Sequence, residues 1–349
     1  MDSISAQEAY RKKKIRLAKF GLFIAWVSSL CMVTFPIFNS LATDGVYQLF
    51  DSKIMTLYVL SLLFVAMGEF FGGIFLILYQ TVVKGVPMRE YGRVWNVRSS
   101  RMVLLSALVA GPLATACLTV SVPLCGSTYS NCVSALTPIL TAVAAAIFLK
   151  ERIGARIIIG ILIAVVGVII AGFEPPEGVT NFYLGIVIAL FAPIGYTAEA
   201  MISTHVMDVS EPLEVCGLYR MIGAGIMEFI IVLAICGFTG NIDWIGIAFG
   251  TVFSNPLLIV FILLTAVLMA VQYGTSYIAN NYSGPSRASA VVWSTPVWSI
   301  PIGFLFAAVG LVPYNVTALG IIGAIVVVVG VVLVLAKPSE MFSLRNIDE

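Results

Sequence analysis

The chain has 349 residues, of which 60% are hydrophobic and 11% are charged. A soluble domain is about half apolar and roughly a quarter charged, so this chain has too few charges to cover a water-facing surface of its size. Its net charge of +1 lacks the basic excess that nucleic-acid binding uses, and its composition excludes a disordered chain and a secreted disulfide scaffold. The sequence therefore predicts an all-α integral membrane protein that lies in a lipid bilayer and has no nucleic-acid partner.

Ten apolar stretches are long enough to cross a membrane as helices. A helix needs about 20 mostly apolar residues to span a hydrocarbon core of roughly 30 Å. These stretches lack the alternation of apolar and polar residues that membrane barrel strands show. The predicted spans are residues 19–41, 54–83, 102–122, 126–149, 156–173, 182–206, 214–239, 256–280, 286–309 and 316–336.

Lys and Arg residues indicate the orientation, because cytoplasmic loops retain them. With the N-terminus in the cytoplasm, all of the 19 basic residues except Lys53 and Arg220 fall on the cytoplasmic side. The opposite orientation would place nearly all of them outside. We therefore expect a multi-pass protein of the cell membrane with both termini cytoplasmic: a basic N-terminus over residues 1–18 and a tail over residues 337–349.

Short sequence matches recur in the same order in the two halves of the chain, which indicates an internal duplication. Residues 21–26 resemble residues 185–190, Glu69 and Phe70 recur as Glu228 and Phe229, Thr137 and Pro138 recur as Thr295 and Pro296, and Gly160 with Gly167 recurs as Gly320 or Gly323 with Gly330. Residues 19–174 and 181–336 then hold five helices each. Because five is odd, the second copy starts on the opposite side of the bilayer. The sequence thus predicts ten transmembrane helices as two inverted five-helix repeats, a recurring plan of secondary transporters.

The stretch from Thr137 to Gly172 resembles a known family. It has a Pro within one helix, a Glu in a short cytoplasmic turn at Glu151, and a following helix marked by glycines. This pattern is similar to the fourth and fifth helices of an EamA-type domain of the drug/metabolite transporter superfamily. Resemblance to two such domains implies ten helices, cytoplasmic ends, and efflux or import of a small metabolite through a central cavity. The second half departs from the pattern, since residues 308–311 hold no Glu.

Polar and aromatic residues inside the spans are the candidates for substrate contact. Polar side chains in hydrocarbon need a hydrogen-bonding partner or water, which a shared cavity would supply. Interhelical hydrogen bonds, worth roughly 0.6 kcal/mol each, are the alternative for any single one of them. Aromatic faces beside a carboxylate would suit an organic cation. The candidate substrate-binding residues are Tyr129, Asn131, Glu199, Gln272, Tyr273, Trp293 and Ser294, and the candidate helix hinges are Pro138 and Pro296.

Four ionisable residues lie within the spans: Glu69, Glu199, Arg220 and Glu228. A charge at the centre of the bilayer costs roughly 2.5 to 3.5 kcal/mol on insertion scales, so something must offset it. Glu69 and Glu228, at matching places in the two halves, either carry a proton, pair with a cationic group, or form a fixed ion pair that only orders the bundle. Arg220 lies near the start of its span, where its side chain could reach the interface. It lies too far around the helix from Glu228 to satisfy that carboxyl.

The sequence argues against an enzyme. Every Asp lies outside the spans, the single His excludes an HExxH site, and neither GxSxG nor a phosphate loop occurs. No metal or cofactor is expected. The predicted function is a secondary transporter that moves a small organic metabolite by alternating access, with proton coupling left open. Three acids against one deep Arg favour a cationic or zwitterionic substrate. The alternatives are a passive channel, a non-transporting scaffold and, less favoured, an intramembrane enzyme. The sequence leaves the oligomeric state open.

Overall fold

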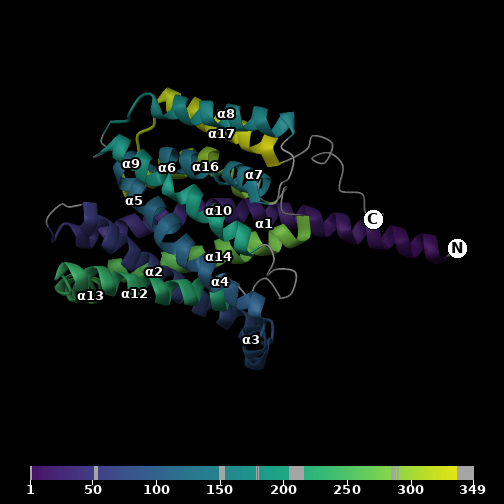
Figure 1. Ribbon diagram of the computed structural model, residues 1–349, viewed down its shortest axis with the longest axis horizontal. Helices are drawn as coiled ribbons and strands as arrows, with labels where there is room; N and C mark the ends of the chain where they lie inside the picture. Colours follow the sequence, from purple (N-terminus) through teal and green to yellow (C-terminus); the bar gives the residue numbers. More distant parts are fainter. Residues whose placement is uncertain are drawn as a thin grey trace.

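The structure is a computed structural model that describes residues 2–50, 54–148, 154–177, 179, 181–203, 216–283, 288 and 291–335. Over these ranges it contains helices and no strand, as the sequence predicts (Figure 1). The first half holds α1 (Asp2–Tyr47), α2 (Ile54–Leu78), α3 (Met88–Trp95), α4 (Arg98–Val109), α5 (Ala116–Cys125), α6 (Ser127–Ser134), α7 (Thr137–Phe148) and α8 (Ala155–Gly172). The second half holds α9 (Phe182–Ala189), α10 (Phe191–Ser203), α12 (Gly223–Thr239), α13 (Asp243–Ser254), α14 (Pro256–Ser283), α16 (Thr295–Ala308) and α17 (Ala318–Leu335). The described ranges also hold three π-helical turns: η1 (Tyr79–Val83) follows α2, η2 (Ala110–Thr115) joins α4 to α5, and η3 (Cys216–Ile222) precedes α12.

Seven helical segments in the described ranges are long and apolar enough to cross a membrane. They are Ile15–Tyr47, Ile54–Val83, Arg101–Cys125, Ala155–Gly172, Phe182–Glu199, Gly217–Thr239 and Pro256–Ala279. Two shorter apolar helices cover Thr295–Ala308 and Ala318–Val334. Each of these segments falls within or overlaps a predicted span, so the protein is a multi-pass helical membrane protein.

Two predicted spans are broken at matching places, which corrects the expectation of continuous helices. A turn at Ala135 and Leu136 separates α6 from α7, and a turn at Trp293 and Ser294 precedes α16. Pro138 and Pro296 therefore lie in the first turn of a helix, where a missing backbone donor leaves no bond unmade. Each Pro follows a turn rather than bending a continuous helix.

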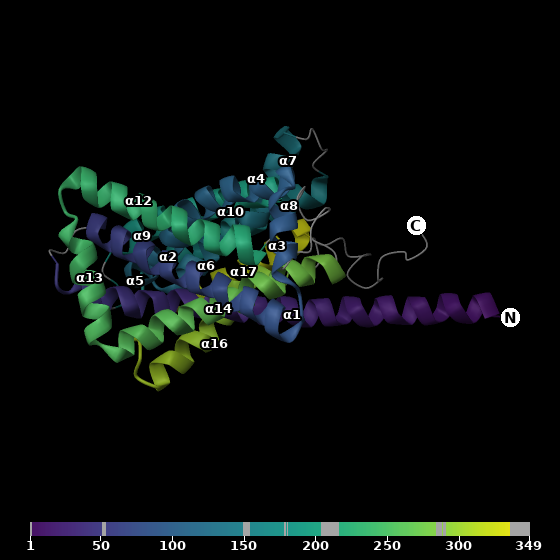
Figure 2. The same ribbon diagram turned by 90° about the horizontal axis from the view of Figure 1, so that it is seen from below.

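Helix α13 was not predicted from the sequence. Its 12 residues span about 18 Å, which is too short to cross a membrane. It runs across one end of the bundle, at a large angle to α12 and α14 (Figure 2). Ala248 and Val252 on one of its faces are buried, whereas Ile247 and Phe253 are exposed. The helix thus covers the ends of its neighbours and presents apolar side chains outward.

Small residues bring pairs of helices into close antiparallel contact. A Cβ atom on Gly160 would lie 2.8 Å from the carbonyl oxygen of Gly330, and one on Gly167 would lie 2.6 Å from the backbone nitrogen of Val327. Because these distances are below van der Waals contact, only glycine allows the backbones of α8 and α17 to approach so closely. Gly160 and Gly167 thus lie on one face of α8, and that face packs against the other half of the chain.

One end of the bundle, which we call the distal end, is formed where α1 ends and α2 begins. Tyr47, Ile54, Gly126 and Asn315 from four separate segments line a common cavity there. The N-terminal part of α1 extends beyond the opposite end (Figure 2). Since α17 starts just after Asn315 and runs away from the distal end, its last described residues lie at the same end as the N-terminal part of α1.

Candidate functional site

The candidate site is built around Arg220, which is 0% exposed inside the bundle. It lies in the π-helical turn η3, and such turns often mark functional positions because they redirect side chains that a regular helix would space evenly. The sequence allowed Arg220 to extend towards the membrane surface. That expectation was wrong, because the side chain is wholly enclosed and pairs with carboxylates from other helices.

Arg220 holds three side chains from three helices, and we call these four residues the charged cluster. Its Nη1 donates to Oε2 of Glu69 at 2.8 Å, its Nε donates to Oε1 of Glu199, and its Nη2 donates to the hydroxyl of Tyr273 at 2.5 Å. The guanidinium carbon also lies 4.4 Å from the ring centre of Tyr273. Charge-assisted bonds of this kind are stronger than neutral ones, so the cluster ties α2, η3, α10 and α14 together.

Glu228 is fully buried beside the charged cluster, yet neither of its carboxyl oxygens has a hydrogen-bonding partner among the described residues. Its carboxyl group rests on the backbone of Gly111 in η2, so closely that a Cβ atom on Gly111 would overlap it. A buried polar group without a partner is costly, and an ionised one is far more so. Glu228 is therefore a buried acid whose carboxyl group forms no hydrogen bond or ion pair with the described residues.

Aromatic side chains lie next to the charged cluster. Tyr196 lies one helical turn before Glu199 on α10, and its ring packs edge-to-face with Trp293 at a centroid distance of 5.7 Å. Tyr196 and Tyr273 belong to one packed group of buried side chains, and the partly buried Trp293 packs against that group. Of the predicted substrate-binding residues, Glu199, Tyr273 and Trp293 thus converge on the same region as Glu69 and Arg220.

The other predicted substrate-binding residues make different contacts. The hydroxyl of Tyr129 accepts a bond from the backbone N–H of Thr317 at 3.2 Å. The amide of Asn131 donates to the carbonyl of Ser127 at 2.8 Å, while its side-chain oxygen has no partner among the described residues. Ser294 donates to the carbonyl of Val291 at 2.6 Å and accepts from Trp298.

Gln272 is buried, and its backbone carbonyl accepts a bond from Ser28 at 2.9 Å. This contact joins α14 to α1. The contacts of Gln272, Tyr129 and Ser294 are of the kind that hold helices together, and their role in substrate binding stays a prediction.

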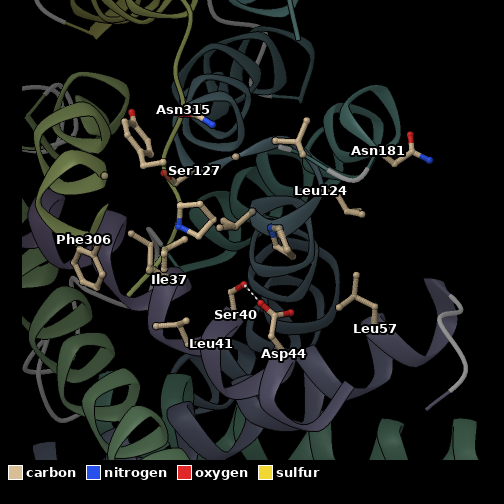
Figure 3. Close-up of a pocket in the computed structure, with 18 of the residues that line it drawn as sticks. Ile37, Ser40, Leu41, Asp44, Leu57, Leu124, Ser127, Asn181, Phe306 and Asn315 are labelled. Carbon is tan, nitrogen blue, oxygen red and sulfur yellow. Dashed lines mark hydrogen bonds between the residues drawn. The ribbon is translucent and has the colours of Figure 1, made fainter. Parts of the chain in front are cut away.

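A second feature, absent from the sequence-based candidates, is a cavity of about 620 Å³ at the distal end (Figure 3). Asp44 near the end of α1 lines it, next to Ser40 one turn earlier, and the two side chains are 3.5 Å apart. An acid and a serine one turn apart at the end of a span was the available sequence signal. Tyr314 also lines the cavity, and burial raises the pKa of Tyr314 to about 12, so its hydroxyl keeps its proton.

These observations define a polytopic helical membrane protein with an ion-paired centre inside its bundle. Residues 19–173 match the model of the EamA-like transporter family. The first half of this chain is therefore similar to an EamA-like transporter domain.

Two individual proteins are also similar. The chain is 23% identical over 206 residues to Protein LicB of Haemophilus influenzae, and the match covers 58% of this chain and 65% of LicB, which is less than two thirds of that relative. A solved structure, described as "Crystal structure of protein", is 13% identical with a TM-score of 0.50 and covers 93% of this chain and 99% of its own. That likeness concerns the fold alone, over nearly the whole chain.

Proposed function

We propose that the protein is a secondary transporter that moves a small organic cation or zwitterion across the cell membrane by alternating access, in exchange for or together with protons. In this proposal residues 19–174 and 181–336 are two inverted EamA-like repeats of five spans each. The distal end faces outward, and both termini, including residues 1–18 and 337–349, face the cytoplasm.

The pattern of helix contacts supports the inverted repeats. Helix α1, the first span of the first half, packs antiparallel to α14, the third span of the second half, with Gly21 against Ser283 and Gly45 against Leu258. The corresponding pair packs in the same way: α9 and α10, which form the first span of the second half, lie against η2 and α5 of the third span of the first half. The remaining pairs, α2 with α12, α6 with α16 and α8 with α17, each join matching spans of the two halves. A twofold relation between the halves requires this set of pairs.

The broken helices support a transport path near their turns. Turns at Ala135 and Leu136 and at Trp293 and Ser294 interrupt the fourth span of each half. Discontinuous spans of this kind surround substrate sites in many secondary transporters, because irregular backbone at membrane depth is tolerated where it lines a cavity or is buried in protein.

The charge balance of the buried acids is the observation that carries the proposal. Among the described residues, three buried carboxyls, Glu69, Glu199 and Glu228, face a single buried guanidinium, that of Arg220. If all four were ionised, two negative charges would remain inside the bundle, which is costly in a membrane. The excess is removed either by protons or by a cationic cargo. A site that takes one or the other couples the movement of cargo to the movement of protons.

Transport by purified protein in proteoliposomes tests this function. Vesicles loaded with a pH-sensitive dye are exposed to a panel of small organic cations, zwitterions and neutral compounds. We expect saturable cation-induced pH changes that Glu228→Gln abolishes, because the amide cannot exchange a proton. The exposed Glu174→Gln is the matched control and should transport as the wild type does. Equal activity of Glu228→Gln and wild type would contradict proton exchange at Glu228.

The competing function is a passive channel. A carrier shows counterflow, in which an excess of unlabelled cargo inside the vesicles speeds the entry of labelled cargo. The reason is that a binding site loaded with cargo returns to the outside faster than an empty one. A channel shows no such acceleration. Non-saturable flux without counterflow would favour the channel.

A further inference from the structure

The distal cavity is separate from the charged cluster. It lies where the C-terminal end of α1, the start of α2, the junction of α5 and α6 at residues 122–127 and the segment at residues 312–315 meet (Figure 3). Leu57 and Leu124 line it and pack with the buried Val120 in an apolar layer. Glu69 lies about 18 Å further along α2 than Leu57, at 1.5 Å per residue. The cavity and the charged cluster are therefore two places along the length of the bundle, with apolar side chains between them.

The lining of the distal cavity has the chemistry of a cation site. Its volume of about 620 Å³ is that of a small-molecule pocket. Asp44 and Glu177 are its acids, and none of the described residues that line it is Lys or Arg. Among the described residues Asp44 has Ser40 as its hydrogen-bonding partner and forms no ion pair. The carboxyl group of Asp44 is thus half-buried and lacks a protein counter-ion within the described ranges.

Aromatic and amide side chains complete the lining. Tyr47, Phe306 and Tyr314 offer aromatic groups, and Gln48 and Asn181 offer polar groups at the same cavity. Aromatic rings attract organic cations through the negative faces of their π systems, by about 0.5 to 2 kcal/mol each. A carboxylate with aromatic neighbours discriminates an alkylammonium group from a neutral group of the same size. It also repels an anion.

We propose that the distal cavity is a binding site for small organic cations, with Asp44 as the counter-ion, and that it collects the cargo before the cargo reaches the charged cluster. The second part rests on the proposed transport function; the first part does not. Gln48 is exposed and lines the cavity, so a charge introduced there changes the electrostatic potential of the cavity without disturbing the core.

Binding of tetramethylammonium to the purified protein in detergent, measured by calorimetry, tests the site. Two molecules of similar size serve as controls: neutral tert-butanol and anionic pivalate. Asp44→Asn, which keeps the size of the side chain, should weaken tetramethylammonium binding by about tenfold or more, or about 1.4 kcal/mol. Asp243→Asn changes an exposed acid that also lies at the distal end but does not line the cavity, and it should leave the affinity unchanged.

Two variants of opposite charge at Gln48 keep the test decisive if Asp44→Asn is unstable. Gln48→Glu should tighten tetramethylammonium binding several-fold, and Gln48→Arg should weaken it by a similar factor. The proposal is overturned if neither change at Gln48 alters the affinity for tetramethylammonium, or if the Asp44→Asn variant binds tetramethylammonium as tightly as the wild type does. It is also overturned if wild-type protein binds tert-butanol as well as it binds tetramethylammonium.

The two proposals fail in different ways. Because binding is measured without a gradient, it does not depend on transport. Asp44-dependent binding in a protein that carries nothing across vesicles supports the cation site and refutes the transport function. Transport with a KM for tetramethylammonium that Asp44→Asn leaves unchanged refutes the distal site and leaves the transport function intact.

Discussion

Replacing Arg220 by Gln removes the one cation of the charged cluster. The guanidinium donates to Glu69, Glu199 and Tyr273 and is 0% exposed. Removing one partner of a buried ion pair costs about 3 to 5 kcal/mol, because the other charge stays buried without compensation. Here two carboxylates lose their partner, so we expect the free energy of unfolding to fall by about 3 to 5 kcal/mol or more. Reversible unfolding in mixed micelles measures the loss.

The same reasoning predicts a rescue. The triple variant Arg220→Gln with Glu69→Gln and Glu199→Gln has no buried charge left in the cluster, and we expect it to regain most of the lost stability. Arg93→Gln is the matched control, since Arg93 is exposed and a pair such as Arg93 with Glu90 is worth about 0 to 1 kcal/mol. The reasoning is refuted if Arg220→Gln lowers the free energy of unfolding no more than Arg93→Gln does. It is also refuted if the triple variant is no more stable than Arg220→Gln.

Further predictions concern close packing and one hydrogen bond, each measured by thermal unfolding in the same detergent. Gly111→Ala should cost about 1 to 3 kcal/mol, because the added methyl group overlaps the carboxyl of Glu228. Gly167→Val should cost a similar amount by pushing α8 away from the backbone of α17. Gly237, whose added Cβ would meet no atom within 4 Å, is the control for both, and equal losses there would contradict the packing argument. Tyr129→Phe should cost about 1 kcal/mol, because its hydroxyl accepts a backbone N–H at the start of α17; an unchanged midpoint would show that this bond adds nothing.

Part of the charged cluster was visible in the sequence. Glu69, Glu199, Arg220 and Glu228 stood out because a charge inside an apolar span is expensive and needs a reason. Their partners were not visible. Arg220 was compared with Glu228 on its own helix, but it bonds Glu69, which is 151 positions away in sequence, and Glu199. Pairing across helices depends on which faces meet, and a hydropathy pattern carries no information about that.

Two features escaped the sequence-based predictions for different reasons. Helix α13 lies in a connection, and a search for stretches of about 20 apolar residues passes over its 12 residues. The local signals of its boundaries were Gly240, which has a left-handed backbone and ends α12, and Pro256, which follows Asn255 and begins α14. The distal cavity has no contiguous signature, because its lining comes from five separate helices, α1, α2, α5, α6 and α16, and from connecting segments far apart in the sequence.

The sequence by itself determined that the chain is a helical membrane protein and where most of its spans lie, because the cost of burying polar backbone in lipid leaves long apolar helices as the solution. It also marked the ionisable residues that matter and the glycines that pack. Only the tertiary structure decided which acid Arg220 holds, that Glu228 lies without a partner against Gly111, and that Asp44 lines a cavity. The reason is that helix formation depends on neighbouring residues, whereas ion pairing and cavity shape depend on how separate helices pack.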